Sequence, residues 1–117
     1  EFSAYVANVV QSGNNLIRPS VRFEVRTTSA DNSLLASTTT GNIGEYGTLT
    51  WNQYGMSFYA PSSSVVLVMV SVAPGGGGND FVVDDITLRT CASTTSASCS
   101  ARKSSADLVR QGIIVLR

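Results

Sequence analysis

The chain has 117 residues, enough for one domain with an apolar core of its own. Charged residues are sparse and their formal sum is zero, so no overall field attracts nucleic acid or an anionic membrane. Histidine is absent, which excludes histidine-based catalytic triads, histidine-ligated zinc and a histidine pH switch. No apolar run approaches the roughly 18 residues that a membrane span needs. We therefore expect no nucleic-acid partner, no membrane insertion and no enzyme.

Short apolar runs between turn residues recur along the chain, whereas helical periodicity is nearly absent. The strands that these runs predict are, in chain order, Phe2–Val10, Val21–Thr27, Leu34–Thr38, one bent or two successive strands over Thr48–Ala60, Val65–Val72, Asn79–Leu88 and Ile113–Leu116. Asp31-Asn32-Ser33 is a plausible hairpin turn. About seven strands at this spacing predict an all-β fold, an antiparallel two-sheet β-sandwich.

Two of these strands have opposite sequence patterns. Val21–Thr27 alternates apolar residues with Arg22, Glu24 and Arg26, so one face is expected to pack and the other to meet water. Val65–Val72 is apolar throughout, as expected for a central strand that is buried on both faces.

The segment Thr48–Ala60 changes the parity of its apolar positions. Leu49 and Trp51 occupy odd positions, whereas Met56 and Phe58 occupy even ones. A bulge or corner near Gln53–Gly55 would bring both pairs to one core, and glycine suits such a place.

The stretch 75–88 places four glycines before a strand that carries two adjacent carboxylates. The glycines predict a permissive turn. Alternation divides the strand into two faces, Val82, Asp84, Ile86 and Leu88 on one and Phe81, Val83 and Asp85 on the other. If Ile86 and Leu88 are core residues, Asp84 is an inward or rim carboxylate that needs a cation, an arginine or backbone N–H groups. Because Asp84 and Asp85 point apart, they cannot flank one bond as a catalytic pair.

Residues 92–117 differ in charge and composition from residues 1–91, the predicted sandwich domain. The body has seven acids and four bases, a net charge of −3, whereas the tail has four bases and one acid, a net charge of +3. Cys91 and Cys99 enclose a Ser/Thr-rich loop and predict a disulfide in an oxidising compartment. Residues 104–110 predict a short turn of helix.

A two-sheet jelly roll normally has eight strands, one more than the sequence pattern predicts here. A missing strand leaves an open sheet edge, which is an aggregation hazard unless something covers it. The tail ends in a short apolar strand, which is expected to fill that edge in its own molecule or in a neighbour's. Its residues are Ile113, Ile114, Val115 and Leu116.

Four segments carry a family likeness. They are Tyr5-Val-Ala-Asn-Val9, Pro19-Ser-Val-Arg-Phe23, Trp51 with Phe58-Tyr-Ala-Pro61, and Gly78-Asn-Asp-Phe-Val-Val-Asp-Asp-Ile86. Over about residues 1–91 the chain resembles the secreted bacterial carbohydrate-binding modules of galactose-binding-like, jelly-roll type. In such modules the first Asp of the pair commonly helps to hold a structural calcium ion, with a Glu and backbone carbonyls of the first strands. The resemblance gives that role to Asp84, and the acidic ligand of the opening strands would lie before Glu1.

Calcium takes six to eight oxygen ligands, and Asp80 and Asn79 are the candidates beside Asp84. In the alternative, Asp84 accepts backbone N–H bonds and Asp80 begins a turn. Both interpretations stay open on the sequence alone.

Sugar recognition needs exposed aromatic rings with amides nearby. Tyr46, Tyr59 and Trp51 supply rings, and Asn52 supplies an amide that can bind hydroxyl groups. In the alternative these rings pack in the core or across strands. We expect Trp51 in the core, and one of Tyr46 and Tyr59 exposed.

These features predict a non-catalytic binding module of a secreted or cell-surface protein, with a glycan or surface polysaccharide as its partner. The alternative is a structural or adhesive subunit that forms homo-oligomers or filaments by adding the C-terminal strand to an open edge. The chain is also expected to be either a whole subunit or part of a longer protein.

Overall fold

A computed structural model describes residues 1–13, 15–91 and 113–116, and for the last four it describes the backbone alone. All regular elements within these residues are strands, which confirms the predicted all-β fold. The strands are β1 (Phe2–Asn8), β2 (Val21–Arg26), β3 (Leu34–Thr39), β4 (Asn52–Met56), β5 (Val66–Ser71), β6 (Phe81–Leu88) and β7 (Ile113–Leu116).

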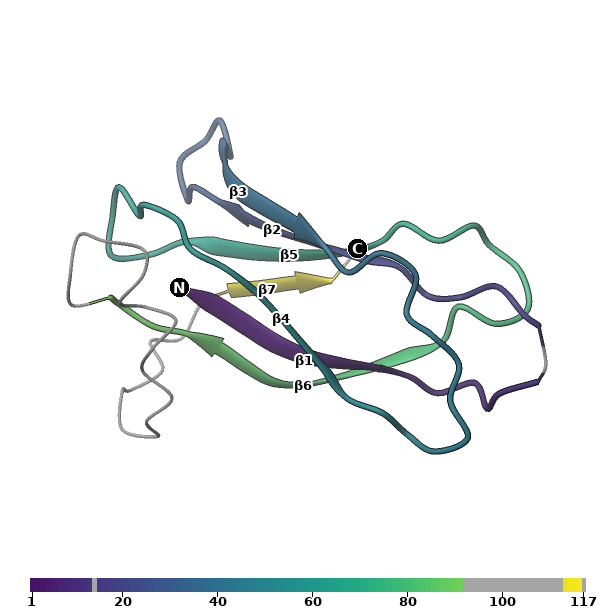
Figure 1. Ribbon diagram of the computed structural model, residues 1–117. Helices are drawn as coiled ribbons and strands as arrows, with labels where there is room; N and C mark the ends of the chain where they lie inside the picture. The colour runs from purple at the N-terminus through teal and green to yellow at the C-terminus, as the bar shows by residue number, and fades with distance from the viewer. Residues whose placement is uncertain (14, 92–112, 117) are drawn as a thin grey trace.

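The strands form two sheets that lie one over the other (Figure 1). One sheet has the order β4-β1-β6 and the other the order β3-β2-β5-β7. Neighbouring strands are antiparallel except β5 and β7, which run parallel. The predicted two-layer β-sandwich is thus confirmed, and its jelly-roll connectivity stays a prediction.

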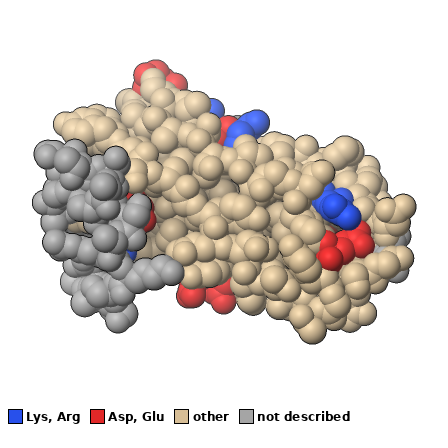
Figure 2. Space-filling model, in the orientation of Figure 1, with Lys and Arg blue, Asp and Glu red and all other residues tan. Residues whose placement is uncertain are grey.

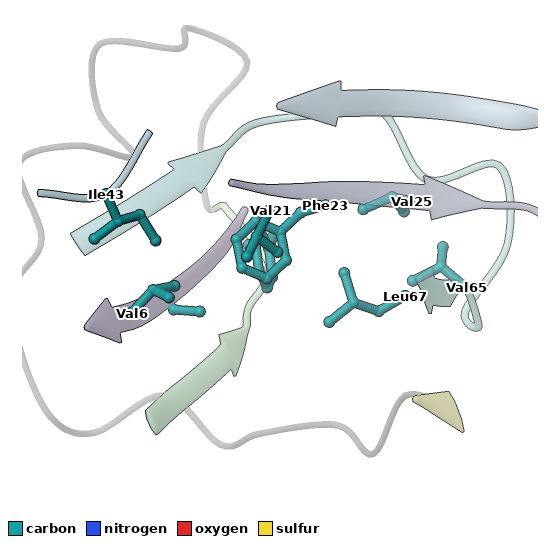
Figure 3. Close-up of a cluster of buried hydrophobic side chains, with 9 residues drawn as sticks. Val6, Val21, Phe23, Val25, Ile43, Val65 and Leu67 are labelled. Atoms are coloured by element: carbon teal, nitrogen blue, oxygen red, sulfur yellow. The ribbon is translucent and has the colours of Figure 1, made fainter. Parts of the chain in front are cut away.

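The core lies between the sheets and is built by alternation along β1 and β2. Alternate residues of β1 and β2 face the opposite sheet and are at most 1% exposed, namely Phe2, Ala4, Val6, Val21, Phe23 and Val25. The rings of Phe2 and Phe23 meet with centroids 5.0 Å apart. Figure 3 shows side chains of both sheets meeting in this cluster, whose members are Phe2, Ala4, Val6, Val21, Phe23, Val25, Ile43, Val65 and Leu67. Burying each large side chain contributes about 1.5–3 kcal/mol.

The outer face of β2 differs from the expected water-facing strand. Glu24 is only 6% exposed, because Arg22 and Arg26 flank it on the same face. Each arginine donates from Nε to a different carboxylate oxygen of Glu24, at 2.7 Å in both cases. The hydrogen bond from Arg26, with that from Arg22, lowers the pKa of Glu24 against an opposing effect of burial.

Strand β1 is shorter than predicted, because Asn8 turns the chain out of the sheet. Its Nδ2 donates to the carbonyl of Ile43 at 3.1 Å, and its Oδ1 accepts from the backbone N–H of Val10 at 2.8 Å. A side chain that satisfies the backbone in this way competes with strand pairing.

Strand β4 corrects the expectation of a bulge near Gln53–Gly55. Its register with β1 is unbroken from Asn52 to Met56, so the residues at even positions face the core throughout. Leu49 and Trp51 are 54% and 39% exposed and are not core residues. The conflict in parity disappears because the odd apolar positions lie outside the core.

Strand β6 contains the bulge that the sequence pattern did not indicate. Tyr5 pairs with Asp84 and Ser3 with Thr87, so one extra residue of β6 is accommodated between these pairs. Phe81 and Val83 before the bulge, and Ile86 and Leu88 after it, all pack on the core. The predicted division of β6 into two strictly alternating faces is therefore wrong. Odd positions face the core before the bulge at Asp84 and Asp85, and even positions face it after the bulge.

Three connections gather at one end of the sandwich, between β1 and β2, β3 and β4, and β5 and β6 (Figure 1). The glycine turn before β6 behaves as predicted, with positive φ at Gly76 and Gly78. Gly78 bridges to Ile17, and Asn79 N–H donates to the Ile17 carbonyl at 2.6 Å. The hairpin turn at 31–33 is also present, closed by Thr27 N–H to the Ser33 carbonyl at 2.9 Å.

Some expectations lie outside the described residues, namely the helical turn at 104–110 and Cys99. Cys91 is not a free thiol, and its predicted pairing with Cys99 stays a prediction. Among the residues that the structure describes, no helix has the length and hydropathy to cross a bilayer.

Candidate ligand-binding face

The outer face of the sheet β4-β1-β6 brings together polar and aromatic residues that are far apart in the sequence. Because Phe2, Ala4 and Val6 face the core, Tyr5 faces outward. Tyr5 pairs with Gln53 of β4 on one side and with Asp84 of β6 on the other. Adjacent strands lie about 4.8 Å apart, so this row of three residues spans about 10 Å.

A second row lies beside the first and contains Ala7 and its partner Val82. Asn52 pairs with Val6 on the core side, so alternation turns the preceding Trp51 outward and beside Ala7. Ala7 is fully buried although it lies on the outer side, whereas Trp51 is 39% exposed. The two rows together, Tyr5, Ala7, Trp51, Gln53, Val82 and Asp84, are termed the outer platform.

The platform combines the groups that sugar recognition uses. A flat aromatic side chain offers apolar area at a low cost in conformational entropy, and the C–H faces of sugar rings can stack on it. The amide of Gln53 both donates and accepts hydrogen bonds, and the ionised carboxylate of Asp84 accepts them. Gln53 and Asp84 are both exposed, on opposite sides of half-buried Tyr5.

The charge near the platform is acidic. Asp84 and its neighbour Asp85 are exposed, and neither of the two platform rows contains Lys or Arg. Arg89, just beyond the end of β6, forms an ion pair with Glu1 at 3.0 Å. Figure 2 shows a broad uncharged surface with a few small charged clusters, in some of which acidic and basic groups lie side by side. Like-charge repulsion at this face disfavours anionic molecules.

The structure does not gather the four residues that the sequence indicated for sugar binding. Trp51 is on the platform, which corrects its predicted place in the core. Asn52 lies on the core side of β4. Tyr59 is 86% exposed but follows the other end of β4, so the length of that strand separates it from Trp51. Tyr46 is 47% exposed, so both of these tyrosines are exposed rather than one.

Tyr46 belongs to the loop end of the sandwich. Its carbonyl accepts a hydrogen bond from Ser12 N–H at 3.3 Å, and its backbone bridges to Gln11. Burial raises the pKa of Tyr54, on the core side of β4, and the nearby Tyr46 phenol raises it further. The Tyr46 ring lies against Gly44, where an added Cβ would be 3.1 Å from its Cζ.

The residues expected to hold calcium do not form a ligand cluster. Asn79 donates from Nδ2 to the carbonyl of Pro74 at 3.0 Å, within the glycine turn. Asp80 precedes Asp84 by four residues, roughly 13 Å along an extended chain. Asp84 Oδ1 accepts a hydrogen bond from Asp85 N–H at 2.8 Å. Among the described residues no three His, Cys, Asp or Glu side chains gather as metal ligands, and calcium at Asp84 stays a prediction.

Sequence reasoning missed Tyr5, Gln53 and Asp84 as one row. The odd positions of 3–7 and 51–55 do alternate outward, which is a signal for two faces. The alignment of residue 5 with residues 53 and 84 depends on strand register, which no local pattern fixes. No family model, curated protein or solved structure matches the chain.

Proposed function

We propose that this domain is a non-catalytic glycan-binding module of a secreted or cell-surface protein, and that it binds a neutral polysaccharide on the outer platform. The observation that carries the proposal is the row Gln53–Tyr5–Asp84 beside half-exposed Trp51. This arrangement supplies a flat apolar surface with hydrogen-bonding groups at its border.

Two features of the chain support a binding role over a catalytic one. The sequence has no histidine, and Asp84, the one carboxylate of the platform, accepts a hydrogen bond at Oδ1 from the backbone N–H of Asp85 in the bulge. An acidic border also disfavours polyuronates and sulfated polymers, because like charges repel. Secretion agrees with the predicted Cys91–Cys99 disulfide, since disulfides persist in oxidising compartments.

The test is affinity electrophoresis of the folded protein in gels that contain neutral polysaccharides or a polyuronate, followed by calorimetry on any ligand found. We expect retardation in a neutral polymer and none in the polyuronate. Trp51→Ala should weaken binding at least tenfold, about 1.4 kcal/mol. The matched control is Tyr59→Ala, which removes an exposed ring away from the platform.

Two outcomes would contradict the proposal. One is indifference of the wild-type protein to every polysaccharide in a broad glycan array. The other is an equal loss of affinity in Trp51→Ala and Tyr59→Ala, which would mean that binding does not use the platform.

A further inference from the structure

We propose that β7 is an exchangeable strand, and that the edge of β5 accepts Ile113–Leu116 from a second copy of this chain. Copies would then join by strand addition. This proposal concerns the sheet β3-β2-β5-β7 and does not depend on glycan binding by the other sheet.

The backbone pairing defines the acceptor edge. One side of β5 pairs with β2 along the whole strand, from Val66 to Ser71. Its other side pairs in parallel with β7, in a register that runs from Val66 opposite Ile113 to Met69 opposite Leu116. The edge therefore accepts a segment of four residues. Backbone hydrogen bonds of this kind are the same whichever molecule supplies the added strand.

The burial of β5 shows why this edge needs an occupant. Leu67 faces the core and Val68 faces the outer side, yet they are only 6% and 7% exposed. A sheet edge with apolar side chains on both faces favours pairing with another chain when it is uncovered. The segment Ile-Ile-Val-Leu is apolar at all four positions. In its register with β5, apolar positions of the two strands are therefore neighbours on both faces of the sheet.

The position of the segment in the chain allows it to reach a neighbour. Residues 89–112 separate β6 from β7, and at about 3.3 Å per residue they can span roughly 80 Å. The longest dimension of the molecule is 44 Å. The tail from residue 92 onward carries a net charge of +3 and the body −3, so the tail of one copy is attracted to the body of another.

Mass action decides which copy fills the edge. A tethered strand has a high effective concentration at its own edge, so pairing within one molecule dominates in dilute solution. Exchange grows with protein concentration. The donor segment and the acceptor edge are different surfaces, so exchange gives either a reciprocal dimer or an open chain of subunits.

The test uses two full-length variants, Val66→Cys and Ile113→Cys, of which one is isotopically labelled. They are mixed at low and at high concentration and treated with a short bis-maleimide. Mass spectrometry of the cross-linked peptides then separates a 66–113 link between copies from any link to a native cysteine. The matched control replaces Val66→Cys by Val70→Cys, which lies on the same face of β5 beyond the segment paired with β7.

We expect a link between copies for the 66–113 pair that rises at least fivefold with concentration, and at most a trace for the 70–113 pair. Light scattering should show masses above 12.3 kDa in steps of one chain. The proposal is overturned if the protein stays monomeric at every concentration without a 66–113 link between copies. Equal links in both pairs would also overturn it, since association would then lack the register of β5 and β7. Circular dichroism confirms that each variant keeps its strand content.

Discussion

At the scale of single residues, Asp85 sets the shape of β6. Its φ of 48° lies in the left-handed region, which L-residues other than Asn and Asp seldom adopt. Asp84 stabilises the same bulge by accepting the Asp85 N–H. The two adjacent carboxylates thus both contribute to the backbone geometry of the bulge.

Replacing Asp85 tests this account. Asp85→Gly should stabilise the fold by up to about 1 kcal/mol, because glycine adopts positive φ without steric cost. Asp85→Val should destabilise it by about 1–3 kcal/mol, since a β-branched residue is strained there. Urea denaturation measures both. Asp80→Gly is the control and should not stabilise, because its φ is not positive; a gain there equal to that of Asp85→Gly would refute the role of the bulge.

Glu24 makes stability depend on pH. Its arginine hydrogen bonds lower the folded-state pKa below the ordinary value near 4.5. A carboxyl group with a lowered folded-state pKa stabilises the protein above its unfolded pKa, and this contribution is lost as the pH falls through the folded pKa. We therefore expect Tm to fall when the pH is lowered from 6 to 3.

The variant Glu24→Gln isolates this effect. It should cost about 1–2 kcal/mol at pH 6, because charge-assisted bonds to two arginines are lost. Its Tm should then fall less between pH 6 and pH 3 than that of the wild type. Asp80→Asn is the control, since Asp80 is exposed and its carboxylate belongs to none of the ion pairs found among the described residues. Identical pH profiles for wild type and Glu24→Gln would show that the carboxylate is not coupled to folding.

At the scale of elements, strands with one clear pattern could be predicted, whereas irregular ones could not. The alternation of Val21, Phe23 and Val25 reports burial directly, since each step along a strand changes the face. In β6 the same reasoning fails, because Asp84 and Asp85 interrupt the alternation and the faces exchange. Whether a strand forms a bulge at two adjacent carboxylates depends on its register with the neighbouring strand. The sequence could supply Trp51 as a candidate ring, but only pairing places it near Tyr5.

The glycine turn before β6 is the second irregular element, and it fixes the loop end of the sandwich. Gly78 has a φ of 100°, and a Cβ there would lie 2.5 Å from the carbonyl oxygen of Ile17. Gly78→Ala should therefore destabilise the fold by about 1–3 kcal/mol. Gly75 has open space around its Cβ position, so Gly75→Ala should change stability by less than about 1 kcal/mol. Thermal unfolding of the two variants compares them, and equal values of Tm would contradict the close packing of Gly78 on Ile17.

At the scale of the whole molecule, the two sheets offer two separate surfaces. Among the described residues no strand packs on the outer face of the sheet β4-β1-β6, whereas β5 in the sheet β3-β2-β5-β7 pairs with the C-terminal strand β7. Assembly through that edge would leave the outer platform of each copy free. Several platforms on one assembly would bind a repeating polymer with greater avidity than a single copy does.

This separation predicts that binding and assembly can be lost independently. Ile114→Asp puts a charge at the β7 position that pairs with buried Leu67, so it should abolish assembly and leave the affinity of a single copy for polysaccharide within twofold. Trp51→Ala should do the reverse. Light scattering reports assembly, and calorimetry below the assembly concentration reports the affinity of one copy. Circular dichroism checks that each variant keeps its fold. If either substitution then removed both assembly and polysaccharide binding, the two surfaces would share residues and the proposed separation would be wrong.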